Sequence, residues 1–548
     1  MASAGSSPPA LAEDPSPPST QDAFIDAIDA AFSDKERECV DLFPPQGATE
    51  DEEQERLASR RQMVISAMSV MESTDDSFIR AAPAWAVLCW FGLALRRRKL
   101  DPNHLYSMSS QVDSIDEFWS HSWHCSGLLK VWLLLMLKNG RAACLGGTLV
   151  AVLVAYLSYA DLLPGWYKEP RIQGPGYSGE FRFSPWSNLS GCASAVLLLI
   201  FWQSSSKVFL DRACIHQGNA RLKAEGILNL GALLKKSRTL VVVWDPSYLS
   251  RLWCVFELAA FLHGHREELQ TSLIIKPTVL VPMSFIMTTT VALMLLFETC
   301  LPETREVAFL RIFLFAVMQV PELYLFQKLW KTVMDAEKQF GSFTWQNVTC
   351  RCCSINHRDP KGNVIICDRE ILEECIVQWY GSVNQLELSV RSDVRNAFIE
   401  QVTRFPLGYQ WLVGVHIVIL WGQLDPVAAG AHGGAYSFAA SKMIVTIAWL
   451  LWIVPVHYIF VFRVSHWMAT CQSRPLRMRI CAACAGCAVI EVLSAAPHVL
   501  QAALYQAMPE EPLIAAGTFL VVTLCLAAVG RHVLTRSWKG GPETVSQK

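Results

Sequence analysis

The chain has 548 residues, of which 52% are hydrophobic and only 18% are charged. Soluble globular proteins carry about 25% charged residues, so this composition favours a membrane protein. The formal net charge of −2 creates no field that would attract nucleic acid, and we therefore expect no nucleic-acid partner.

No segment within residues 1–113 is long and apolar enough to be predicted as a bilayer span. Residues 1–50 are rich in Pro, Ser and Ala, cannot bury enough apolar surface and are predicted to be disordered. Residues 51–113 are predicted to be a cytosolic helical region, with an amphipathic helix near 52–73. The apolar stretch 81–94 is about 14 residues long and is followed by basic residues, so it fits an interfacial or buried helix better than a span.

Long apolar segments dominate the rest of the chain. A helix needs about 20 apolar residues to cross a bilayer, and eight segments approach this length. The expected fold class is therefore an α-helical polytopic membrane protein with about eight spans and the lipid bilayer as its partner. The predicted spans are 142–162, 187–204, 279–300, 307–327, 409–424, 440–462, 480–503 and 513–530.

The basic residues in the short flanks predict the orientation of these spans. Lys and Arg gather on one side, and the opposite loops 425–439 and 504–512 contain neither. The positive-inside rule then places both termini in the cytoplasm of an integral membrane protein. The parts predicted after residue 278 are a transmembrane hairpin at 279–327, a cytosolic Cys-rich and helical segment at 328–408, a four-span bundle at 409–530 and a cytosolic tail at 531–548.

Between the second and third predicted spans lies a segment with the pattern of an α/β fold. KVFLD at 207–211 is a short buried strand, and a helix with one apolar face follows at Leu222–Lys236. RTLVVVWD at 238–245 is a second strand, Leu252–Leu262 is helical, and SLIIKP at 272–277 is strand-like. Strands alternating with helices predict a parallel sheet covered by helices.

The residues of this segment resemble a known family. FLDRACIHQG and SRTLVVVWDPSYLSRLWCVFEL are similar to the second and third conserved boxes of Toll/interleukin receptor (TIR) domains. SIDEFWSHSW at Ser114–Trp123 resembles the first box, and an amphipathic helix follows at Leu128–Lys138. The resemblance implies a flavodoxin-like module split into 114–139 and 207–278 by a transmembrane hairpin at 140–206. The combination is similar to multi-pass protist membrane proteins with TIR-like segments.

The resemblance implies two alternative functions for the module. One is signalling or assembly, with self-association or other TIR-type domains as partners. The other is cleavage of NAD⁺ as a substrate, because Glu257 lies four residues after Trp253, as in TIR domains that split NAD⁺. A carboxylate there would stabilise the oxocarbenium-like cation formed as the nicotinamide–ribose bond breaks. Trp253 would stack on the base, and Ser120, His121 and Arg212 would belong to the NAD⁺ cleft.

A group of thiols and one imidazole lies in the segment 328–408. Such ligands suit tetrahedral zinc, but their spacing, C-x-C-C-x₃-H-x₉-C, matches no standard zinc finger. In a reducing cytosol the same cysteines can also stay free and packed, so both interpretations remain open. The residues concerned are Cys350, Cys352, Cys353, His357 and Cys367.

Ionisable residues also occur inside the predicted C-terminal spans. Glu491 lies near the middle of 480–503, with His498 two turns later, while His416 and His457 lie in neighbouring spans. Because such residues are costly in a bilayer, they predict a functional site. An ion or proton-coupled transport pathway through the bundle is thus a further alternative to simple helix–helix hydrogen bonding.

Overall fold

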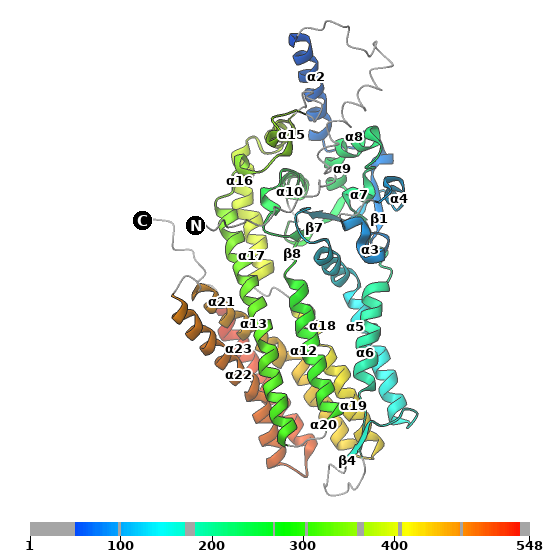
Figure 1. Cartoon of the computed structure of the whole chain (residues 1–548), viewed down its shortest axis with the longest axis vertical. Coiled ribbons are helices and arrows are strands. Elements are labelled where there is room, and N and C mark those ends of the chain that lie inside the picture. The colour runs from blue at the N-terminus through cyan, green and yellow to red at the C-terminus, as the bar shows by residue number, and fades with distance from the viewer. Residues whose placement is uncertain are drawn as a thin grey trace, which may run out of the picture. The chain divides into compact units, whose positions relative to one another are not determined.

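The computed structural model describes residues 50–96, 100–169, 181–266, 269–301, 305–358, 367–403, 408–471 and 475–536. The predicted disordered tail therefore lies outside the described residues, except for Glu50, where helix α2 begins (Figure 1). The chain divides into two compact units. The first contains the described residues within 50–128, 205–274 and 342–393, and the second contains the remainder.

A mixed six-stranded sheet forms the centre of the first unit, with the strand order β2-β1-β6-β3-β7-β8. In parallel pairing, Phe118 of β3 lies opposite Phe209 of β6 on one side and opposite Leu240 of β7 on the other. β1 is antiparallel to both β6 and β2. The strands are β1 (Arg80–Pro83), β2 (Ser110–Gln111), β3 (Ile115–His121), β6 (Lys207–Phe209), β7 (Ser237–Trp244) and β8 (Leu273–Pro277).

This pairing confirms that the segments on either side of the predicted hairpin form neighbouring parallel strands. The sheet is mixed rather than wholly parallel, because β1 and β2 extend it on the β6 side. The region 51–113, predicted to be helical, contains helices but also the strands β1 and β2. Ala and Pro have low strand propensity, but buried Ala82 pairs with Val208 and so adopts the strand through its tertiary contacts.

Helices follow the strands of the sheet as the apolar periodicity predicted. The helix expected at Leu222–Lys236 is broken at Asn229 into α8 (Ala220–Leu228) and α9 (Leu230–Lys235). The buried Asn229 side chain donates to the carbonyl oxygen of Glu225 and binds Thr74, which is how it interrupts the helix. The third-box helix is α10 (Leu252–Gly264), and nine of its thirteen residues are buried.

Within the predicted segment 328–408, residues 342–393 belong to the same unit as the sheet. Their main helix, α15 (Asp368–Tyr380), packs on α10: the Tyr380 hydroxyl donates to the carbonyl oxygen of Ala259 at 2.8 Å. Trp379 of α15 donates to Ser69 at the end of α2 at 2.7 Å. The other helices of this unit are α2 (Glu50–Ser69), α3 (Ala84–Gly92), α4 (Pro102–Ser107), α7 (Asp211–Cys214), α11 (Leu269–Ser272), α14 (Arg351–Ser354) and α16 (Val383–Ser389).

The second unit is helical, and in it α12 and α13 run side by side (Figure 1). Among the described residues, five helical segments of this unit are long and apolar enough to cross a membrane, and a bent pair would make a sixth. The helices are α5 (Gly127–Tyr159), α6 (Trp186–Phe201), α12 (Leu280–Cys300), α13 (Arg305–Gly341), α17 (Arg395–Thr403), α18 (Gly408–Val415), α19 (Val418–His432), α20 (Tyr436–Ala448), α21 (Val454–Thr470), α22 (Leu476–Ala507) and α23 (Pro512–Arg536). A short β4–β5 pair (Tyr167–Glu169 and Phe181–Phe183) completes the unit.

The structure corrects several predicted boundaries. The expected helix at Leu128–Lys138 and the span 142–162 form one continuous helix, α5. The expected span 409–424 is the α18–α19 pair, bent by 43°, and α19 extends to His432, into the predicted loop 425–439. The span expected at 187–204 is the 16-residue α6, which is shorter than a usual span. The stretch 307–327 lies within the 37-residue α13.

A tryptophan wedged between two glycines fixes the contact of α19 with α5 and α6. A Cβ atom on Gly191 would lie 2.8 Å from Cδ2 of Trp421, and one on Gly147 would lie 2.8 Å from Cζ2 of the same ring. The Trp421 indole nitrogen donates to the Thr148 hydroxyl at 3.0 Å. Nearby, buried Asp425 accepts hydrogen bonds from the backbone nitrogens of Ser187 and Asn188 at 2.8 and 3.1 Å. These bonds satisfy free N–H groups at the start of α6.

Candidate functional site

Polar side chains meet at the carboxyl ends of β3 and β7. The Ser120 hydroxyl donates to Oε2 of Glu257 at 2.5 Å and is 2.7 Å from the Tyr248 hydroxyl. The Ser122 and Ser247 hydroxyls are 2.7 Å apart. The first-box and third-box segments, far apart in the sequence, are therefore hydrogen-bonded to each other.

The turn after β7 is built by Asp245, whose carboxylate accepts from the backbone nitrogen of Ser247 at 2.8 Å. This bond is the local side-chain turn that Asp favours. It orients Ser247 toward Ser122 and brings the chain into α10, whose first two turns carry Trp253 and Glu257. Local turn chemistry thus places the third-box residues over the end of β3.

A small pocket lies beside these hydrogen bonds. Its wall is mostly apolar and includes the aromatic ring of Trp253. The polar side chains of His121, Asp211, Arg251 and Glu257 also line it. The cavity has a volume of about 70 Å³. One water molecule needs roughly 10–15 Å³ of cavity volume, so the pocket has room for a few water molecules in this conformation. A larger ligand could enter only if side chains moved.

Burial governs the electrostatics of Glu257. Glu257 is partly buried at the wall of the pocket, and desolvation raises the pKa of Glu257 to about 8, an effect that the Ser120 hydrogen bond opposes and the nearby Asp211 adds to. Glu257 is therefore mostly protonated at pH 7 and ionised above pH 8. In its neutral form it is a hydrogen-bonding acid, whereas stabilising a cation requires the ionised form.

The structure brings together four of the five residues expected in the cleft. Ser120 binds Glu257 directly, and His121 and Trp253 line the same pocket. Arg212 instead donates to the carbonyl oxygens of Ala94 and Arg96 and is not among the lining residues.

The pocket contains two charged residues that the sequence analysis did not single out, Asp211 and Arg251. Arg251 directly precedes α10, two residues before Trp253, and its Nη1 is 3.3 Å from Nδ1 of His124. Asp211 follows strand β6, where the carboxyl end of a parallel strand commonly carries site residues. Both positions adjoin motif residues, and this adjacency is the signal that would have identified them.

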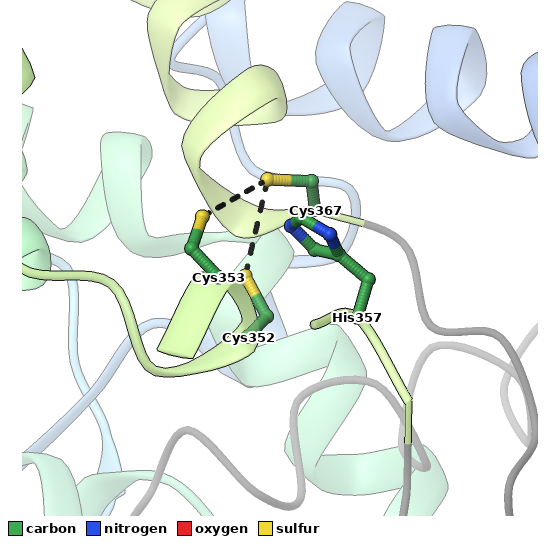
Figure 2. A group of neighbouring side chains, drawn as sticks. All are labelled: Cys352, Cys353, His357 and Cys367. Atoms are coloured by element: carbon green, nitrogen blue, oxygen red, sulfur yellow. Dashed lines mark hydrogen bonds between the residues drawn. The ribbon is translucent and has the colours of Figure 1, made fainter. Parts of the chain in front are cut away.

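Four of the five expected metal ligands form one cluster (Figure 2). The ligand atoms of Cys352, Cys353, His357 and Cys367 all lie within 4.8 Å of one another. Cys350 is outside this set and belongs with Cys352 and Asp368 to a second group.

The intramembrane polar residues expected from the sequence separate into two places. His416 and His457 both lie against the Tyr458 ring, at 4.8 and 5.2 Å between ring centroids. The Tyr458 hydroxyl is 3.1 Å from buried Glu322 of α13, a residue that the sequence analysis did not consider. His498 stacks on Trp449, and Glu491 is half-buried on α22. Glu322 carried the same signal as Glu491, an acid inside an apolar run.

Comparisons with protein-family models, curated proteins and solved structures find no match to this chain.

Proposed function

We propose that the protein is a multi-pass membrane protein whose first unit acts as a cytosolic signalling and assembly module of the TIR type. The observation that carries the proposal is the hydrogen bonding of Ser120 and Ser122 to Tyr248, Glu257 and Ser247. The motif residues of the two boxes are in direct contact at one end of the sheet. The order β6-β3-β7-β8 supports the proposal further, because it is the 2-1-3-4 order of flavodoxin-like folds.

The strand pairing also supports the proposed topology. β3 and β6 are neighbours in one sheet, so the chain between His121 and Lys207 must leave and return on the same side of a bilayer. That stretch therefore crosses an even number of times, which fits a hairpin of α5 and α6. The Asn139 side chain of α5 donates to the carbonyl oxygens of Leu199 and Trp202 at the end of α6, as expected for two antiparallel helices.

Aromatic residues exposed on the first unit offer a surface for self-association. Trp90 is 79% exposed, and Phe91 beside it is 44% exposed. Trp90, Phe91 and Gly92 have φ values of 51°, 55° and 58°. Left-handed backbone at two bulky residues is strained, and such strain persists where function requires it. Large exposed aromatic side chains are typical of interfaces.

We expect the full chain in detergent to self-associate reversibly, and we expect Trp90→Ser to weaken this association by roughly tenfold or more, as at interface hot spots. Sedimentation velocity over a wide concentration range measures the self-association of the wild type and its weakening in Trp90→Ser. Trp166→Ser is the matched control, since Trp166 is 62% exposed in the second unit. A monomer at every concentration, or equal effects of the two substitutions, would contradict the proposal.

The Ser120–Glu257 pair favours a second candidate function, cleavage of NAD⁺ by the same module. Nicotinamide leaves as a neutral molecule, so Glu257 would act as an ionised carboxylate that stabilises the sugar cation. Trp253 and Arg251 line the same pocket and would meet the base and the phosphates. Ligand entry would require the pocket to widen.

This candidate predicts a particular pH dependence. Because the pKa of Glu257 is about 8, NAD⁺ consumption by the full chain is expected to rise about tenfold per pH unit between pH 6 and 7 and to level off above pH 8. Glu257→Gln should abolish the activity. Glu225→Gln, which alters a buried carboxylate of α8 outside the pocket, should leave it intact. Equal rates for the wild type and Glu257→Gln would exclude catalysis by Glu257.

A further inference from the structure

The cysteine cluster of the first unit has the dimensions of a metal site. The sulfur atoms of Cys352 and Cys353 lie 3.9 and 3.7 Å from the sulfur of Cys367. In tetrahedral zinc coordination with Zn–S bonds of about 2.3 Å, two sulfur ligands are separated by about 3.8 Å. The observed separations therefore match the edges of such a tetrahedron.

The fourth ligand comes from an imidazole beside the three sulfur atoms (Figure 2). Asn356 and His357 both have φ of 53°, and this left-handed turn brings the His357 backbone nitrogen within 2.9 Å of the carbonyl oxygen of Cys352. The Nε2 atom of His357 is buried and has no hydrogen-bond partner among the described residues. A buried nitrogen without a donor or acceptor is costly unless another ligand satisfies it, and a metal ion does so.

The alternative donor group fits zinc less well. Cys350 and Cys352 have sulfur atoms 2.9 Å apart, closer than two ligands of one tetrahedral ion and too far for a disulfide bond. The chain also contains buried Cys375, which lies on α15 outside both groups. Cys350 and Cys375 therefore serve as control positions for substitutions of the proposed zinc ligands.

We propose that Cys352, Cys353, His357 and Cys367 bind a structural zinc ion in a Cys₃His site. Cys352 and Cys353 lie in the short helix α14, and Cys367 is the N-cap residue of α15. The ion would therefore join the two helices. Three thiolates and one imidazole are a usual closed set for structural zinc, with no position left for a reacting water.

The same ion would stabilise the start of the pocket helix. Thr349 lies three residues before Cys352. Its backbone N–H donates to the carbonyl oxygen of Ser250 at 2.7 Å, and its carbonyl oxygen accepts from the backbone N–H of Leu252 at 3.3 Å. These bonds lie next to Arg251 and directly precede Trp253 of the pocket. Zinc would thus hold in place the segment that pairs with the first turn of α10. This inference does not depend on the proposed function.

The first test is the zinc content of the full chain, purified in detergent under reducing conditions and measured by elemental mass spectrometry. We expect about one zinc ion per chain. Cys367→Ser and Cys353→Ser are expected to lower the zinc content at least tenfold, whereas Cys350→Ser and Cys375→Ala retain it. Wild-type protein without stoichiometric zinc would overturn the proposal, as would loss of zinc in Cys350→Ser with retention in Cys353→Ser.

The second test uses the wild-type chain and so does not depend on how a variant folds. A zinc chelator is expected to raise amide hydrogen exchange at least tenfold across residues 249–256, and added zinc should reverse the change. Exchange in α8, which contacts neither segment through any of these bonds, should stay constant. Unchanged exchange at 249–256 after the zinc has been removed would refute the coupling to α10.

Discussion

Glu257→Gln is expected to stabilise the protein at pH 8 and to have little effect at pH 5. The glutamine oxygen can still accept the Ser120 hydrogen bond, but it carries no charge that burial would penalise. Substituting a buried polar residue usually destabilises a protein, whereas this substitution is expected to stabilise it at pH 8. The result distinguishes a protonated carboxyl group from an ion-paired carboxylate.

The sign follows from proton linkage. The pKa of Glu257 is raised from 4.5 to about 8 by folding. Below pH 4.5 both folded and unfolded chains hold the proton, and stability is greatest. Between pH 4.5 and 8 only the folded chain holds it, so stability falls as the pH rises, by at most ~1.4 kcal/mol per pH unit. At pH 8 we expect Glu257→Gln to be more stable than the wild type by a few kcal/mol.

Thermal unfolding of the full chain at pH 5, 6.5 and 8 measures this difference. Glu370→Gln is the control, because Glu370 is an exposed partner of Arg61 and such surface pairs contribute little. If Glu257→Gln is destabilising at every pH, the carboxylate is ionised and stabilised by a positive partner. Loss of NAD⁺ cleavage together with increased stability would be the signature of a strained catalytic group.

Gly191→Ala and Gly140→Ala are expected to change stability in opposite directions. The new Cβ at position 191 would lie 2.8–3.0 Å from ring atoms of Trp421. The indole has little room to retreat, because its opposite edge lies so close to the Gly147 backbone that a Cβ built there would be 2.8 Å from Cζ2 of the ring. Overpacking of this kind costs about 1–3 kcal/mol. At Gly140 of α5 a Cβ meets nothing within 4 Å, so alanine should stabilise the helix by roughly 0.5–1 kcal/mol.

Unfolding of the full chain in detergent, followed by intrinsic fluorescence or by loss of the folded species on gel filtration, compares the two variants. In a Trp421→Ala background, Gly191→Ala should cost less stability than it does in the wild type, because the two residues are in contact. Equal effects of the two glycine substitutions would show that helix propensity, rather than the Trp421 contact, determines stability at Gly191.

Some of this architecture could be predicted because its signals are local. β7 is an apolar run rich in β-branched residues and is followed by Asp245-Pro246. All of its last five residues are buried, as in a strand covered on both faces. The meeting of Ser120 with Glu257 followed from the box resemblance, which relates segments far apart in the chain. Motif and periodicity together were sufficient for the centre of the sheet.

The remaining features depend on contacts that no local pattern encodes. β1 is short and contains Ala and Pro, and it becomes a strand only because β6 is beside it. The polar stretch Lys138–Arg141 includes Gly140 and looked like a helix end, yet it contains no proline, and α5 continues through it. The Cys and His side chains, irregularly spaced in the sequence, are brought together by the left-handed backbone conformation of Asn356 and His357. The sequence pattern does not predict this conformation.

The strand order has a consequence for biosynthesis. When β3 leaves the ribosome, neither of its parallel neighbours, β6 and β7, has been made, because helices α5 and α6 come between β3 and β6 in the chain. Until then β3 exposes two unpaired edges, which is a hazard for aggregation. Nascent chains stalled between α5 and β6 should therefore be the species that chaperones protect, and the sheet can close only after both helices have been made.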